Sequence, residues 1–173
     1  MAKRLTIDGY GQLELNQVAF RRDGRIEAQC KLASGIEYVE NGMLLAVDPA
    51  KREVKMPTGD DKFIALNYTT EHMYDERLAH GLKHFRLNKD SFLPRLGYLA
   101  TGDKFTTNCL AYNEASYDNE DAVKAAVGTT LVYGKVCNLG AIELTADAEG
   151  AVVAVVEATT MPDGQFAVKF IAL

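Results

Sequence analysis

Residues 25–32 alternate without interruption between apolar and polar side chains. The apolar members of this run are Ile26, Ala28, Cys30 and Leu32. A period of two predicts a β-strand with one buried side and one side facing solvent. An Asp23-Gly24 turn signal precedes the run, and residues 13–20 form another candidate strand, so the sequence predicts a hairpin across this turn.

Two further stretches in the first half of the chain carry strand patterns. Residues 43–47 and 53–56 are rich in apolar side chains and flank the segment Asp48-Pro49-Ala50-Lys51. Proline at the second position suits a type I turn, so we expect a second hairpin here. Residues 62–69 are expected to form one more strand.

The last third of the chain holds the clearest hairpin pattern. Residues 151–160 are almost continuously apolar or β-branched, residues 161–164 read Met-Pro-Asp-Gly, and residues 165–173 return with apolar side chains. Two such runs around a Pro-Asp-Gly turn are typical of an antiparallel strand pair. Residues 130–136 predict another strand before this hairpin.

The middle of the chain, residues 70–126, has weaker periodicity. Thr70 is positioned to cap a short helix over residues 71–82, and Asn119 to cap a second helix over residues 119–127. The rest of this segment predicts loops and short strands. Because long irregular stretches in a globular domain are usually functional, we expect residues 70–126 to be a loop-rich interface segment.

These patterns predict a mainly β fold, a β-sandwich or barrel built from antiparallel hairpins, with one or two short helices and a loop-rich middle. The 173 residues are expected to form a single β-rich domain, 1–173. Hydrophobic residues make up 47% and charged residues 25%, an ordinary globular balance. The formal net charge of −5 argues against nucleic acid or an anionic membrane surface as a partner.

The three cysteines, Cys30, Cys109 and Cys137, are too far apart in the sequence to form a CxxC metal or redox motif. We expect reduced, buried thiols in a protein made in the cytoplasm. The first residues are basic but lack the apolar run of a signal peptide. The longest apolar stretch, residues 151–156, is too short to span a bilayer.

Catalytic chemistry finds little support in the sequence. His80 and His84 have the i, i+4 spacing that places two imidazoles on one helical face, and His72 lies nearby. The residues between them, Gly81-Leu82-Lys83, do not form an HExxH motif, and no nucleophile elbow or phosphate-binding loop is present. We predict no catalytic, cofactor-binding or metal-binding residues, and a small metal-dependent enzyme using the three histidines is the alternative hypothesis.

Aromatic and arginine side chains, which are favoured at the centres of protein interfaces, gather between residues 74 and 95. The predicted interface residues are Tyr74, Arg77, His84, Phe85, Arg86, Phe92 and Arg95. The competing interpretation is that the aromatic members belong to the core. If the interface interpretation holds, charge reversal at Arg77 or Arg86 is expected to weaken a partner contact without unfolding the protein.

Three segments together resemble small virion structural proteins of tailed bacteriophages, of the kind that decorate or cement the capsid. The segments are Asn-Gly-Met-Leu-Leu followed by Val47-Asp48 (residues 41–48), Tyr-Asp-Glu-Arg with Gly-Leu-Lys-His-Phe (residues 74–85), and Pro-Arg-Leu-Gly with Gly-Asp-Lys-Phe-Thr-Thr-Asn (residues 94–108). The resemblance covers about the central half of the chain.

The resemblance implies a non-enzymatic subunit of the virion, a head decoration or cement protein that stabilises the capsid lattice and is often oligomeric. Its partners are then the major capsid protein lattice, copies of itself, or both, with no nucleic acid, membrane or cofactor. Several weak contacts on one shell add through effective concentration. Another virion component, a tail or head–tail connector subunit, is the closest alternative.

Overall fold

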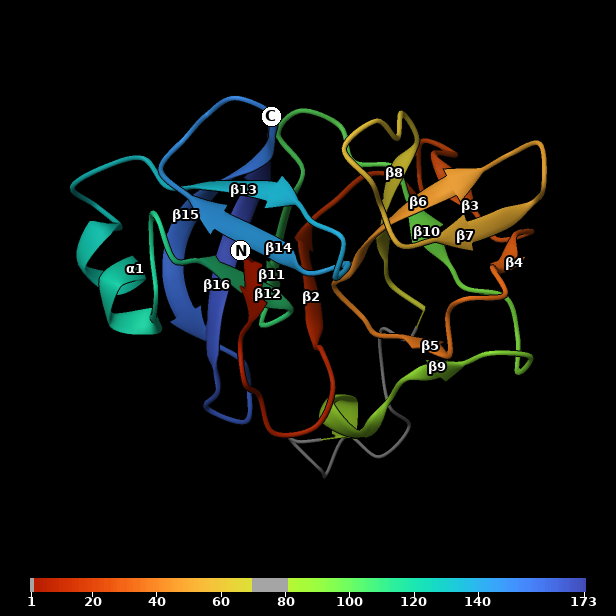
Figure 1. The fold of residues 1–173 in the computed structure, drawn as a ribbon, viewed down its shortest axis with the longest axis horizontal. Helices are drawn as coiled ribbons and strands as arrows, with labels where there is room; N and C mark the ends of the chain where they lie inside the picture. Colours follow the sequence, from red (N-terminus) through yellow and green to blue (C-terminus); the bar gives the residue numbers. More distant parts are fainter. Residues whose placement is uncertain (1, 70–80) are drawn as a thin grey trace.

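The computed structural model describes residues 2–69 and 81–173. Strands predominate among these residues and the helices are short, which confirms the predicted mainly β class. Figure 1 shows two large sheets side by side along the longest axis, with the eight-stranded sheet on the left and the six-stranded sheet on the right. The arrangement is sandwich-like, and the described strands do not close into a barrel.

The larger sheet has eight strands and is antiparallel except where β12 runs parallel to β14. Its members, in spatial order, are β1 (Ala2–Arg4), β12 (Leu110–Asn113), β14 (Ile142–Thr145), β13 (Tyr133–Val136), β15 (Ala151–Thr160), β16 (Phe166–Ala172), β11 (Lys104–Thr107) and β2 (Leu13–Gln17). Strands from the beginning, middle and end of the sequence therefore lie next to one another.

The second sheet has six short strands, and a separate two-stranded ladder lies beneath it in Figure 1. The six are β3 (Ile26–Glu27), β10 (Leu96–Gly97), β8 (Ile64–Asn67), β6 (Leu44–Asp48), β7 (Glu53–Lys55) and β4 (Lys31–Leu32). The ladder pairs β5 (Tyr38–Val39) with β9 (Leu87–Asn88), and the helices are the 3₁₀ turn η1 (Gly81–His84) and α1 (Glu120–Ala126).

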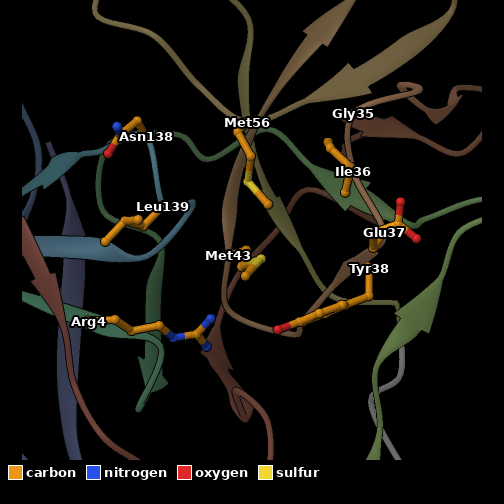
Figure 2. A pocket seen from close by; sticks show the side chains of 9 residues that line it. All are labelled: Arg4, Gly35, Ile36, Glu37, Tyr38, Met43, Met56, Asn138 and Leu139. Atoms are coloured by element: carbon orange, nitrogen blue, oxygen red, sulfur yellow. The ribbon is translucent and has the colours of Figure 1, made fainter.

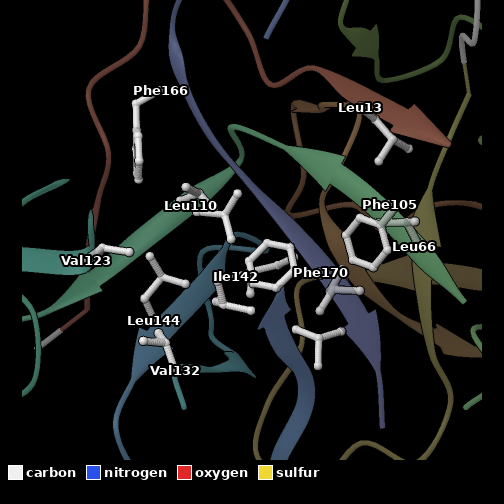
Figure 3. Close-up of a cluster of buried hydrophobic side chains, with 14 of the residues drawn as sticks. Leu13, Leu66, Phe105, Leu110, Val123, Val132, Ile142, Leu144, Phe166 and Phe170 are labelled. Atoms are coloured by element: carbon white, nitrogen blue, oxygen red, sulfur yellow. The ribbon is translucent and has the colours of Figure 1, made fainter. Parts of the chain in front are cut away.

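One hydrophobic cluster lines the inner face of the eight-stranded sheet and reaches into the six-stranded sheet. Figure 3 shows Phe105 beside Phe170, whose ring centroids are 5.6 Å apart, with Leu110 and Ile142 close by. Leu66, on β8, belongs to the same cluster. A second cluster holds all three cysteines and joins residues of the six-stranded sheet, such as Leu45, to Ala111 on β12 of the eight-stranded sheet. Both clusters therefore contain residues of the two sheets and hold the sheets together.

The predicted first hairpin is wrong, although its turn is present. The chain turns at residues 20–25, where the Arg25 N–H donates to the Phe20 carbonyl, but β2 then pairs with β11 and β3 pairs with β10. The alternation expected over residues 25–32 holds only at its end, where Cys30 and Leu32 are buried, whereas Ile26 is 45% exposed. Phe20, at this turn, is fully buried and packs on Gly97 of β10.

The other predicted hairpins are confirmed. β6 pairs with β7 around residues 48–51, where the Asp48 carboxylate accepts hydrogen bonds from the Ala50 and Lys51 N–H groups. β15 pairs with β16 around the turn at residues 161–164. The strand expected at residues 62–69 is β8, and the strand expected at residues 130–136 is β13.

The middle of the chain is more ordered than the sequence suggested. Residues 104–113 supply β11 and β12, which lie inside the eight-stranded sheet. Asn119 caps α1 through its side-chain oxygen, as expected, and Gly128 follows the helix with φ of +89°. Most of the helix expected over residues 71–82 lies outside the described residues, and residues 81–84 form a 3₁₀ turn.

Candidate functional site

The predicted interface residues fall into three groups. Tyr74 and Arg77 lie outside the described residues. His84, at the end of η1, and Arg95, just before β10, are exposed. Phe85 is half-buried, and its ring lies 6.4 Å from that of Phe92.

The loop between β9 and β10 presents two adjacent apolar side chains to solvent. Phe92 is 57% exposed and Leu93 is 44% exposed. Both line a groove of about 160 Å³, together with Leu32 and Lys31 of β4. In Figure 1 this loop lies at the right-hand end of the molecule, far from α1. We call Phe92 and Leu93 the apolar tip.

Local hydrogen bonds hold the loop that carries the apolar tip. Asp90 adopts a left-handed conformation with φ of +64°, and both the N–H and the hydroxyl of Ser91 donate to the Asn88 carbonyl. This compact turn lies directly before Phe92. The apolar tip is therefore presented by a folded loop and not by an extended, unsupported one.

The other end of the loop is tied to buried polar groups. The Arg95 N–H donates to the Thr69 hydroxyl at 3.1 Å, and that hydroxyl donates to the Asn67 side-chain oxygen. The Asn67 amide in turn donates to the Glu40 carbonyl at 2.8 Å. Asn67 is fully buried, so the chain of bonds connects the exposed loop to the interior.

Arg86, another predicted interface residue, is half-buried against two aromatic rings. Its guanidinium carbon lies 4.7 Å from the centroid of the Tyr38 ring and 5.0 Å from that of Tyr10. The two rings approach edge to face, with centroids 5.9 Å apart. Cation–π contacts of this kind hold segments together, so Arg86 connects the N-terminal segment to the β5–β9 ladder.

A second concave region lies between the two sheets. It has a volume of about 290 Å³ and is lined in part by Met43, Met56 and Leu139. Figure 2 shows Arg4 and Tyr38 pointing toward each other across it. The Arg4 guanidinium is already paired with the Glu40 carboxylate, so its charge is balanced within the protein.

The three cysteines are buried, and burial determines their protonation. Burial raises the pKa of Cys109 to about 12, and burial also raises the pKa of Cys137 and of Cys30. The three thiols are therefore protonated near neutral pH, the form that is a poor nucleophile. In residues 2–69 and 81–173, no three His, Cys, Asp or Glu side chains form a group that could hold a metal ion.

The metal hypothesis depended on residues that are only partly described. His72 and His80 lie outside the described residues, and His84 is exposed at the end of η1. His84 lies in a 3₁₀ turn over residues 81–84, so it does not have the α-helical position that the i, i+4 spacing assumed. The structure thus places one of the three imidazoles at the surface.

Sequence reasoning missed the residues that complete these sites. Lys31 and Leu32 border the groove beside the apolar tip, yet they precede Phe92 by about sixty residues. Tyr10 and Tyr38 hold Arg86 from two other distant segments. No local pattern marks such contacts, since they arise only when the strands are paired. Leu93 was detectable, because it lies next to the predicted Phe92.

No described helix is both long and apolar enough to cross a bilayer. Comparison with protein-family models, curated protein sequences and solved structures finds no match for this chain.

Proposed function

We propose that this protein is a non-enzymatic virion structural protein, a head decoration or cement subunit that binds and stabilises a capsid lattice. The observation that carries the proposal is the apolar tip, two adjacent large side chains that are 57% and 44% exposed on an internally bonded loop. Exposed aromatic anchors beside a groove are typical of protein–protein contacts.

The residues around the apolar tip support a contact with another protein. Arg95 is exposed two residues after Leu93, and Lys31 borders the groove, so the apolar centre has a polar rim. The formal charge of the chain is −5, which favours association with basic patches on a lattice and affects chiefly the rate of encounter.

The direct test is to purify the virions that carry this chain and count its copies by quantitative mass spectrometry. A head decoration protein is expected at a copy number comparable to that of the major capsid protein. Absence from mature particles would overturn the proposal. A low copy number at one vertex in a density map would favour the tail or head–tail connector alternative.

The apolar tip is tested by adding back purified protein to particles that lack it. Phe92→Asp is expected to weaken attachment by about 30-fold, because a buried aromatic anchor contributes about 2 kcal/mol. Leu173→Asp is the matched control, since Leu173 is 55% exposed and the variant changes charge equally. Equal attachment of both variants would show that the tip is not the contact.

A further inference from the structure

β15 is much longer than the strand beside it on one side. β13 pairs with it only from Ala151 to Ala154, and the Val155 N–H then donates to the Val132 carbonyl at 2.8 Å. Residues 157–160 pair with β16 on the other side. Within the described part of the chain, no strand pairs with the opposite side of residues 157–160, which we call the β15 edge.

The ladder with β16 shows which backbone groups of the β15 edge point outward. The Met161 N–H donates to the Gln165 carbonyl at 2.8 Å, so these two residues form a hydrogen-bonded pair. Bonded and non-bonded pairs alternate along antiparallel strands. Glu157 and Thr159 are therefore bonded to β16, and Ala158 and Thr160 direct their N–H and C=O groups away from it.

An uncharged groove lies where the β15 edge begins. It has a volume of about 320 Å³ and is lined by residues 127–132 together with Val155 and Val156, none of which is charged. Leu131 is 56% exposed and Val156 is 45% exposed. Val156 lies at the register shift between Val155 and Glu157, which marks a β-bulge in this strand.

We propose that the β15 edge pairs in antiparallel fashion with the same edge of a second copy of this chain. Outward N–H and C=O groups with the spacing of a strand are satisfied best by another strand. A two-fold axis at Ala158 gives two reciprocal backbone hydrogen bonds between the copies at that residue. This inference does not depend on attachment to a virion.

The side chains make this edge self-complementary. The two-fold axis at Ala158 sets Glu157 opposite Thr159 of the second copy, so no like charges face each other. It also sets Val156 opposite Thr160 of the second copy, which brings the end of the second strand to the groove at Leu131. A bulge and a glutamate often protect an edge from pairing, but here both lie at one end and residues 158–160 are uncharged.

The test is sedimentation of the purified chain by analytical ultracentrifugation over a range of concentrations. The wild type is expected to dimerise in the micromolar range. Ala158→Pro removes an outward N–H without removing a bond to β16, and it is expected to shift the population to monomer with unchanged circular dichroism. A wild type that stays monomeric throughout would overturn the proposal and favour a foreign strand as the occupant.

Charge variants test the register without depending on proline. Thr159→Lys places an ammonium opposite Glu157 of the second copy, and two such pairs are expected to tighten the dimer by about threefold or more. Combining Thr159→Lys with Glu157→Lys sets like charges opposite each other and is expected to weaken the dimer below the wild type. A dimer that responds to neither variant would show that the copies meet elsewhere.

The groove has its own matched pair of variants. Leu131→Lys is expected to weaken the dimer at least tenfold, whereas Phe63→Lys, at a residue 53% exposed on the six-stranded side, is expected to leave it unchanged. If Ala158→Pro fails to fold, the outcome rests on the lysine variants. An equal effect of Leu131→Lys and Phe63→Lys would contradict the proposed site.

Discussion

The guanidinium of Arg4, on β1, forms a two-bond ion pair with the carboxylate of Glu40, which lies 36 residues away between β5 and β6. Glu40 is 3% exposed, and the Gly11 N–H donates to the same carboxylate. The first strand of the eight-stranded sheet is thereby tied to the segment that leads into β6. A buried carboxylate requires such partners, because removing one leaves an uncompensated charge.

Arg4→Ala is expected to destabilise the protein by about 2 to 3 kcal/mol, somewhat less than a fully buried pair, because the Arg4 side chain is 28% exposed. Urea denaturation followed by circular dichroism measures the free energy of unfolding. Arg22→Ala is the control, since Arg22 is 81% exposed in its ion pair with Asp23 and is expected to change stability by less than about 0.5 kcal/mol. Similar losses in both variants would contradict the role given to Glu40.

Arg86→Glu is expected to destabilise the protein by about 1 to 2 kcal/mol, because it removes a cation held by Tyr10 and Tyr38. This expectation replaces the sequence-based one, in which charge reversal at Arg86 spared the fold. Arg86→Lys keeps the charge and is expected to recover part of the loss. Thermal unfolding of the three proteins in parallel measures the difference, and an unchanged midpoint for Arg86→Glu would contradict it.

Gly97→Ala is expected to destabilise the protein by about 2 kcal/mol through overpacking. A Cβ at this residue would lie 2.6 Å from atoms of the Phe20 ring, which is fully buried and has little room to move. Gly59→Ala is the control, because a Cβ there meets nothing within 4 Å. Urea midpoints of both variants provide the comparison, and a neutral Gly97→Ala would show that Phe20 can shift.

Stability is expected to fall as the pH is lowered below the ordinary aspartate pKa of 3.8. The hydrogen bond from Lys55 lowers the pKa of Asp61 below its ordinary value of 3.8. Burial alone would raise the pKa of Asp163, but hydrogen bonds from Gln165 and Gln12 outweigh it and lower that pKa.

The pKa values of these two carboxyl groups are lower in the folded protein than in the unfolded chain. As the pH falls, the unfolded chain therefore binds protons before the folded protein does. The stabilisation is therefore complete above pH 3.8 and is lost as the pH falls through the folded pKa values. Melting temperatures across this range measure the slope. Asp61→Asn is expected to show a smaller acid-induced drop than the wild type, and an identical slope would exclude Asp61 as a source.

The three thiols are expected to react slowly with a disulfide reagent in the native protein near neutral pH. Burial raises the pKa of Cys109 to about 12 and also raises the pKa of Cys137. Little thiolate is therefore present, and the buried sulfur atoms are poorly accessible to a reagent. In denaturant all three thiols are expected to react rapidly. Fast modification of one equivalent in the folded protein would identify a reactive thiol and contradict this expectation.

Local features of the fold could be predicted, because each depends on neighbouring residues. The Asp48 turn, the Asn119 cap and the hairpin around residues 161–164 all follow from side chains within a few positions. The pairing of β2 with β11 could not, since the partners are about ninety residues apart and neither carries a local signal for the other.

In the candidate site, too, features set by neighbouring residues could be predicted and contacts between distant segments could not. Phe92 and Arg95 were predicted from the clustering of aromatic and basic residues, and both are exposed. The same clustering included Arg86, whose partners come from two remote segments, so the sequence did not distinguish an internal contact from an external one. The β15 edge was not predictable, because it exists only where β13 is shorter than β15.

The position of β16 between β15 and β11 affects the order in which the molecule can be assembled. Until residues 166–172 are in place, β11 and β2 have no strand pairing with the other five strands of their sheet, although residues 108–109 connect β11 to β12. A fragment ending before residue 166 would therefore expose two incomplete half-sheets with open sides. The pairing that completes the larger sheet can therefore form only when residues 166–172 are present. Truncation before residue 166 would leave both parts of the sheet without their shared neighbour.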